Sequence, residues 1–100
     1  MNQNRDNRQP QVEIKASDEK LKGEYSNMAN IFHTKEEFVL DFLNIFPPTG
    51  TLNARIIISP EHFKRMANAM EENWKKYERQ FGDIEASEEP SRADRIGFQE

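Results

Sequence analysis

The stretch from Ile56 to Gly82 constrains this chain most, because residue type marks both ends of a strand that leads into a helix. Three successive isoleucines favour an extended, half-buried backbone. Ser59 can accept a hydrogen bond from a free amide of the following helical turn, and Pro60 suits the first helical position, where its missing N–H costs nothing. Gly82 can adopt the left-handed conformation that ends a helix. The sequence therefore predicts a strand followed at once by a helix over residues 60–81.

Apolar side chains recur along that helix with helical spacing, so they should form one wide apolar stripe. Its members are Phe63, Met66, Ala67, Met70, Trp74, Tyr77 and Phe81. A stripe of this width is typical of a helix that packs against a sheet.

Four extended segments are predicted before the helix, separated by short polar connections. They cover residues 11–16, 24–32, 38–46 and 52–58. For residues 24–32 a strand is favoured, and the residue types are also compatible with a helix. The predicted fold class is therefore α+β, a four-stranded, mostly antiparallel sheet followed by one long C-terminal helix.

A chain of 100 residues has room for a single domain, which we place at residues 11–82. Residues 1–10 and 83–100 are polar and are expected to be disordered tails. The predicted domain is close to neutral, with ten basic and eleven acidic residues, so the net charge of −4 lies mainly in the C-terminal tail. Without cysteine, neither a disulfide nor a thiolate metal site can form. No apolar run approaches the roughly 20 residues that span a bilayer, and we expect a soluble, cytoplasmic protein.

The segment 38–46 is apolar on both faces, which predicts a strand covered on both sides. Phe38, Leu40, Phe42 and Phe46 can meet the helix. Val39, Leu43 and Ile45 would remain on the other face with nothing left to cover them, unless the N-terminal segment folds over it. These three residues are the predicted interface of a homodimer or higher oligomer.

Asp41 places a carboxylate inside this apolar strand, where an unpaired charge would be costly. Arg55 lies on the neighbouring predicted strand, so a structural ion pair between the two is favoured over a catalytic role for Asp41. The two histidines, His33 and His62, lie in different elements and lack metal-ligand spacing. No catalytic residue, metal or cofactor is predicted, and the protein is not expected to be an enzyme.

Three runs carry a resemblance to a known family: GEYSNMANIFHTKEEFVLDF (23–42), RIIISPEHFKR (55–65) and YERQFG (77–82). Together they resemble a family of small bacterial proteins catalogued as a domain of unknown function, over about residues 11–82. The resemblance implies a compact, mostly antiparallel domain that ends in a long helix, and it implies no activity. The connection at residues 47–50 departs from the usual form of that family.

A weaker likeness is at the level of the fold alone. Four strands and a helix are similar to the single-stranded nucleic-acid binding domains of the Pur and Whirly type, and fold does not determine function.

Two functions from different classes follow. The first is a self-associating protein-interaction module with an unidentified protein partner. The alternative is a single-stranded DNA or RNA binding protein, associated with transcription, that uses Tyr25, Asn27, Asn30 and Arg55 on the sheet as stacking and polar groups.

Overall fold

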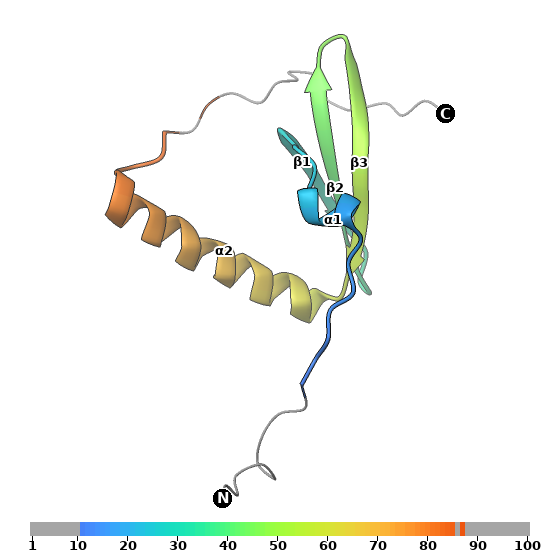
Figure 1. The fold of residues 1–100 in the computed structure, drawn as a ribbon, viewed down its shortest axis with the longest axis horizontal. Coiled ribbons are helices and arrows are strands. Elements are labelled where there is room, and N and C mark those ends of the chain that lie inside the picture. The colour runs from blue at the N-terminus through green and yellow to red at the C-terminus, as the bar shows by residue number, and fades with distance from the viewer. Residues whose placement is uncertain (1–10, 86, 88–100) are drawn as a thin grey trace, which may run out of the picture.

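The computed structural model describes residues 11–85 and 87, which form a sheet flanked by a short and a long helix (Figure 1). The elements are α1 (Asp18–Lys22), β1 (Met28–His33), β2 (Phe38–Phe46), β3 (Thr49–Ile58) and α2 (Pro60–Phe81). The strands form an antiparallel sheet in the order β1-β2-β3. The α+β class and the long final helix are confirmed, but the sheet has three strands where four were predicted. The tail at residues 1–10 and most of the tail at 83–100 lie outside the described residues.

The predicted N-terminal strand at residues 11–16 is absent, because this segment has no regular secondary structure and its side chains are exposed. Val12, Ile14 and Ala16 alternate as strand residues do, but only three apolar side chains are available to bury surface. That gain does not offset the backbone entropy lost when a strand is ordered on a sheet edge. The first strand is therefore β1, inside and just beyond the predicted segment 24–32.

Helix α1 replaces what the sequence indicated as a plain polar connection. The Ser17 hydroxyl accepts a hydrogen bond from the Lys20 backbone N–H at 3.2 Å, and Gly23 follows the helix with a positive φ of 78°. The signal for this turn of helix was present, because a capping serine, acidic residues in the first turn and a final glycine mark helix ends.

Strands β2 and β3 form the centre of the fold. The boundaries of β2 are those predicted, whereas β3 begins at Thr49, three residues earlier than expected. The hairpin turn consists of Pro47 and Pro48 alone, joined by a cis peptide bond. Gly50 lies opposite Ile45, and a Cβ there would approach the Ile45 side chain to 3.1 Å, so glycine gives Ile45 its room.

The strand registers divide the sheet into two faces. The Asp41 face carries Val39, Asp41, Leu43 and Ile45 on β2, with Met28, Asn30 and Phe32 on β1 and Leu52, Arg55 and Ile57 on β3. The Phe38 face carries Phe38, Leu40 and Phe42 on β2, with Ala29, Ile31 and His33 on β1 and Ala54, Ile56 and Ile58 on β3. The register shifts between Phe42 and Leu43, where β3 holds one extra residue, Asn53.

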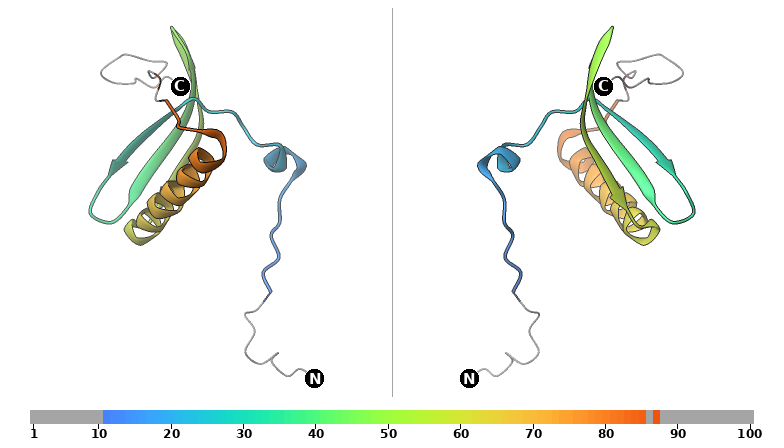
Figure 2. Two further views of the ribbon diagram at one scale, coloured as in Figure 1. Left: turned by 90° about the vertical axis from the view of Figure 1, so that its left-hand side faces the viewer. Right: turned by 90° about the vertical axis from the view of Figure 1, so that its right-hand side faces the viewer.

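Helix α2 begins and ends where the sequence predicted. The Ser59 hydroxyl accepts a hydrogen bond from the His62 N–H at 3.1 Å, and Gly82 follows the last turn with a φ of 96°. The Phe63 ring stacks on Phe38 with centroids 4.0 Å apart, so α2 lies on the Phe38 face. Figure 1 shows that the helix leaves the sheet beyond this contact, and Figure 2 shows α2 on one side of the sheet. Helix α2 contains no buried residue. The expectation that Met70, Trp74 and Phe81 pack on this sheet is therefore wrong.

Candidate functional site

The most polar feature of the sheet interior is an ion pair across β2 and β3. Asp41 is fully buried and faces Arg55 in the strand register. Arg55 donates from Nε to Oδ1 at 2.7 Å and from Nη2 to Oδ2 at 2.8 Å, so both carboxylate oxygens are engaged by one guanidinium. This two-point geometry is the strong form of such a pair. The ion pair predicted from the sequence is present.

The ion pair keeps Asp41 charged. Hydrogen bonds from Arg55 hold the pKa of the Asp41 carboxyl below its ordinary value of 3.8, and they outweigh burial, which acts in the opposite direction. The same bonds raise the pKa of Arg55. A carboxylate with both oxygens occupied and a lowered pKa is poorly suited to general acid or base catalysis near neutral pH.

Around this pair the Asp41 face combines a ring, an amide and a cation. Asn30 lies beside Asp41 on β1, in the row that continues to Arg55 on β3. The Arg55 guanidinium carbon lies 5.8 Å from the centroid of the Phe32 ring, within the range of a cation–π contact.

The residues predicted for nucleic-acid binding are only partly brought together. Asn30 and Arg55 share the row of Asp41, but Asn27 lies near the other end of β2. There its side chain accepts a hydrogen bond from the Ile45 N–H at 2.9 Å and donates one to the Ile45 carbonyl at 3.0 Å. The exposed Tyr25 precedes β1, and its carbonyl accepts a hydrogen bond from Asn53 Nδ2 at 2.6 Å. Because both polar atoms of the Asn27 side chain bond the Ile45 backbone, this amide pairs with β2 as a strand backbone would and is not available to a ligand.

The predicted interface residues share the Asp41 face as expected, but they lie inside the chain's own core. Val39, Leu43 and Ile45 are 8%, 3% and 7% exposed. Val39 lies between Phe32 and Ile57 in the register, and Leu43 lies between Met28 and Leu52. The premise that nothing in the chain covers them is therefore wrong. The apolar surface that this face still exposes belongs to the flanking Phe32, Leu52 and Ile57.

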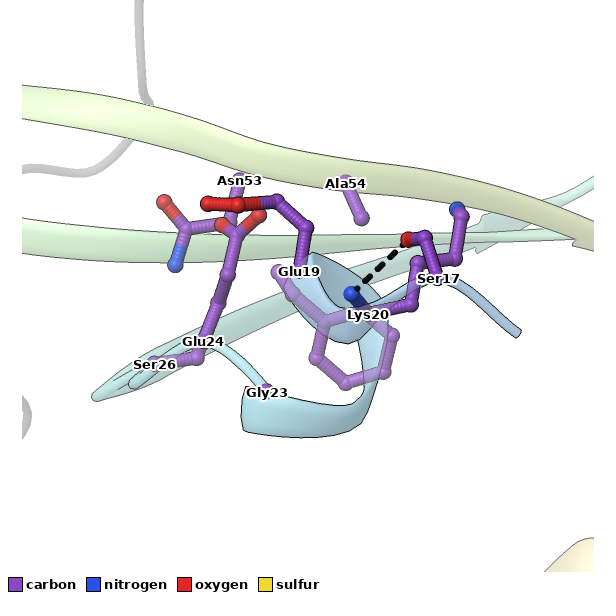
Figure 3. A pocket seen from close by; sticks show the side chains of 9 residues that line it. Ser17, Glu19, Lys20, Gly23, Glu24, Ser26, Asn53 and Ala54 are labelled. Atoms are coloured by element: carbon purple, nitrogen blue, oxygen red, sulfur yellow. Dashed lines mark hydrogen bonds between the residues drawn. The ribbon is translucent and has the colours of Figure 1, made fainter.

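A shallow, open depression of about 600 Å³ lies between α1 and the β2–β3 hairpin (Figure 3). Phe42 and Ala54 line its apolar side, and Glu19, Glu24 and Asn53 supply polar groups. Figure 3 shows the carboxylates of Glu19 and Glu24 on the Asn53 side of this depression. Among residues 11–85 and 87, no three side chains of the metal-binding types gather into a metal site.

Comparison with known proteins identifies the family. The family model described as "Protein of unknown function (DUF3467)" matches residues 1–86. The chain belongs to the DUF3467 family. The resemblance found in the sequence to a family of unknown function is confirmed, and the match extends to both sides of residues 11–82. No curated protein and no solved structure matches the chain.

An exposed apolar surface of this DUF3467 chain lies on α2, which the sequence predicted to be covered by the sheet. Trp74 and Tyr77 are each 50% exposed, and Met70 and Phe81 are more so, at 63% and 65%. The periodicity correctly placed these residues on one side of the helix, but periodicity alone does not specify which surface covers that side. Within the described part of the chain, no helix is long and apolar enough to cross a membrane.

Proposed function

We propose that this DUF3467 protein is a non-enzymatic, self-associating module that acts through protein–protein contacts. The observation that carries the proposal is α2, a helix of 22 residues with an apolar side and no buried residue. Continuous exposed apolar surface of this extent is characteristic of an interaction site. A homodimer or higher homo-oligomer is the simplest assembly that covers it.

The chemistry of the polar groups supports a non-enzymatic role. Asp41 is the buried carboxylate of the sheet, and Arg55 occupies both of its oxygens. The His33 ring lies against Phe38, with centroids 5.1 Å apart. Both groups serve the packing of the sheet.

Sedimentation velocity over a wide range of protein concentration tests the proposal. We expect a dimer or larger species at roughly 100 μM, where an interface with a Kd of about 10 μM is mostly occupied. A single species with the mass of one chain at that concentration would refute self-association.

Single-stranded nucleic acid is the alternative ligand, and the Phe32 ring beside Arg55 is the feature that favours it. The occupied amide of Asn27 and the binding of Arg55 to Asp41 argue against it. Fluorescence anisotropy of labelled single-stranded DNA and RNA, at low and moderate salt, separates the two proposals. Saturable binding that weakens with salt and is lost in Tyr25→Ala would favour nucleic acid. The interaction module predicts no such binding.

A further inference from the structure

The apolar side of α2 is continuous along the outer half of the helix. Met70, Trp74, Tyr77 and Phe81, which we call the α2 stripe, follow one another at spacings of four, three and four residues and therefore share one side. The rings of Tyr77 and Phe81 lie 5.0 Å apart. Because each residue adds about 1.5 Å of helix length, the stripe extends over roughly 16 Å.

The Phe38 face of the sheet is a second apolar surface, and its middle row lies between Phe63, which stacks on Phe38, and the depression that α1 forms with Phe42 and Ala54. In its middle row, Leu40 is buried between Ile31 and Ile56, which are 51% and 46% exposed. Helix α2 touches this face at the row before it, where Phe63 stacks on Phe38. The isoleucines next to that contact therefore face the side on which α2 leaves the sheet.

The α2 stripe and the Phe38 face are thus two halves of a helix-on-sheet core that one chain does not close. A sheet of this kind is normally stabilised when a helix covers its apolar face. Figure 1 shows α2 diverging from the sheet, and both views of Figure 2 place α1 away from α2, on the β3 side. Within the described part of the chain, only four apolar side chains are buried: Val39, Leu40, Leu43 and Ile45.

We propose that the α2 stripe of one chain packs on the Phe38 face of a second copy, and reciprocally, in a symmetric homodimer. The proposal rests on the self-association proposed above and assigns it to this surface. It replaces the interface predicted from the sequence, because Val39, Leu43 and Ile45 have little surface left to bury.

A second copy fits this surface better than a different protein for two reasons. Each chain carries both an α2 stripe and a Phe38 face. Two chains related by a two-fold axis can therefore cover both surfaces at once. The flanks of the stripe also carry charges of both signs, including the Glu71–Lys75 pair at 3.2 Å, so they do not select a partner of one charge.

The available area is of the right size for such a dimer. The four stripe residues and the two isoleucines are each 46% to 65% exposed. Together they offer roughly 500–600 Å² per chain, given that large aromatic side chains bury about 150–250 Å² when fully covered. Stable interfaces bury about 800 Å² per partner, so the six residues would supply most of such an interface.

Cross-linking between two single-cysteine variants tests the assignment, because the natural chain has no cysteine. One variant carries Tyr77→Cys on the stripe and the other carries Ile56→Cys on the Phe38 face. After the two are mixed, a short bis-maleimide should join them into a mixed dimer. Ile57→Cys is the matched control, since it is the neighbouring residue of the same type, 56% exposed, on the opposite face. It should cross-link much less to Tyr77→Cys.

Each possible result decides the question. Equal cross-linking of Ile56→Cys and Ile57→Cys would overturn the assignment. So would a double variant, Ile56→Cys with Tyr77→Cys, that cross-links only within one chain, because α2 would then fold back on its own sheet. If no cross-link forms while sedimentation shows a dimer, this interface is wrong and self-association stands. If sedimentation shows only monomer, both proposals fail.

Charge substitution gives an independent readout. Ile56→Lys should weaken the dimer by about 100-fold or more, as expected for a buried anchor residue, whereas Ile57→Lys should change Kd by less than about threefold. Circular dichroism of both variants checks that each remains folded. The reverse order of effects would place the interface on the Asp41 face.

Discussion

Asp41 stabilises the folded protein through the ion pair that its ionised carboxylate forms with Arg55, so this contribution depends on pH. Its pKa in the folded protein is lowered from 3.8, which means that folding favours the ionised form. The stability that the Asp41–Arg55 pair contributes is therefore fully present above about pH 5. It is lost as pH falls through the lowered pKa of the folded state.

We expect Asp41→Asn to lower the free energy of unfolding by about 1–3 kcal/mol at pH 7, because a neutral amide loses the charge-assisted bonds in a buried position. The difference from the natural protein should begin to shrink below about pH 5, where the carboxyl of the unfolded chain starts to bind protons, and should disappear only below the lowered pKa of folded Asp41. Urea unfolding at a series of pH values measures both effects. A difference that stays constant down to low pH would contradict this account.

Asn27 stabilises the end of β2 through its side chain, which bonds both backbone groups of Ile45. Asn27→Ala leaves the Ile45 N–H and carbonyl without these partners, and we expect a loss of about 1–3 kcal/mol. Hydrogen exchange of the Ile45 amide should accelerate in Asn27→Ala. Asn27→Asp keeps the oxygen that accepts from this amide, so its exchange should stay slow. Unchanged protection in Asn27→Ala would show that this bond is dispensable.

For individual side chains, the sequence predicts the Asp41–Arg55 contact but not the contact of Asn27 with Ile45. Asp41 and Arg55 could be paired because two adjacent predicted strands bring opposite charges together and a buried charge needs a partner. The role of Asn27 could not be found this way. It depends on the local path of the chain before β1, and no residue pattern marks an amide that substitutes for backbone.

Helix α2 begins at a capping residue, Ser59, that can be recognised in the sequence. Ser59→Ala removes the acceptor for the His62 N–H and should lower stability by about 1 kcal/mol, while Ser59→Asp should retain most of it. Thermal unfolding followed by circular dichroism at 222 nm compares the three proteins. A Ser59→Ala protein as stable as the natural one would mean that water replaces the cap fully.

The elements that were predicted well are those whose signals are local. Residue types within the helix mark both ends of α2, and the unbroken apolar run defines β2. A strand at residues 11–16 was predicted from alternation alone, but a strand also needs a sheet edge and enough apolar surface to stay on it. The direction in which α2 leaves the sheet was equally beyond the sequence, because the stripe shows that a cover is needed without showing which chain provides it.

For the whole molecule, the small core links folding to assembly. Among residues 11–85 and 87, the four buried apolar side chains are few for a domain that has no cysteine to form a disulfide. Association that covers α2 should stabilise the fold, so the melting temperature should rise with protein concentration. A 100-fold change in protein concentration changes the free energy of association by about 2.7 kcal/mol. A melting temperature that does not change over that range would contradict this coupling.

Trp74 is the single tryptophan of the chain and reports on the same equilibrium. It is half exposed in one chain and should become more buried on association. Its fluorescence maximum should shift to longer wavelength as the protein is diluted and the assembly dissociates. The shift should follow the dissociation curve measured by sedimentation, and a maximum that stays constant while the mass falls would place Trp74 outside the contact.

Only Ser59 separates the end of β3 from the start of α2, so the joint has almost no slack. If α2 is held at one angle to its own sheet, it can reach the Phe38 face of a second chain only in a limited set of orientations. A symmetric dimer requires that this angle be the same in both chains. If the joint were loose, each chain could pass its helix to a different neighbour, and a discrete pair would give way to an open-ended fibre. In the proposed dimer, this one-residue joint would limit how far the assembly can grow.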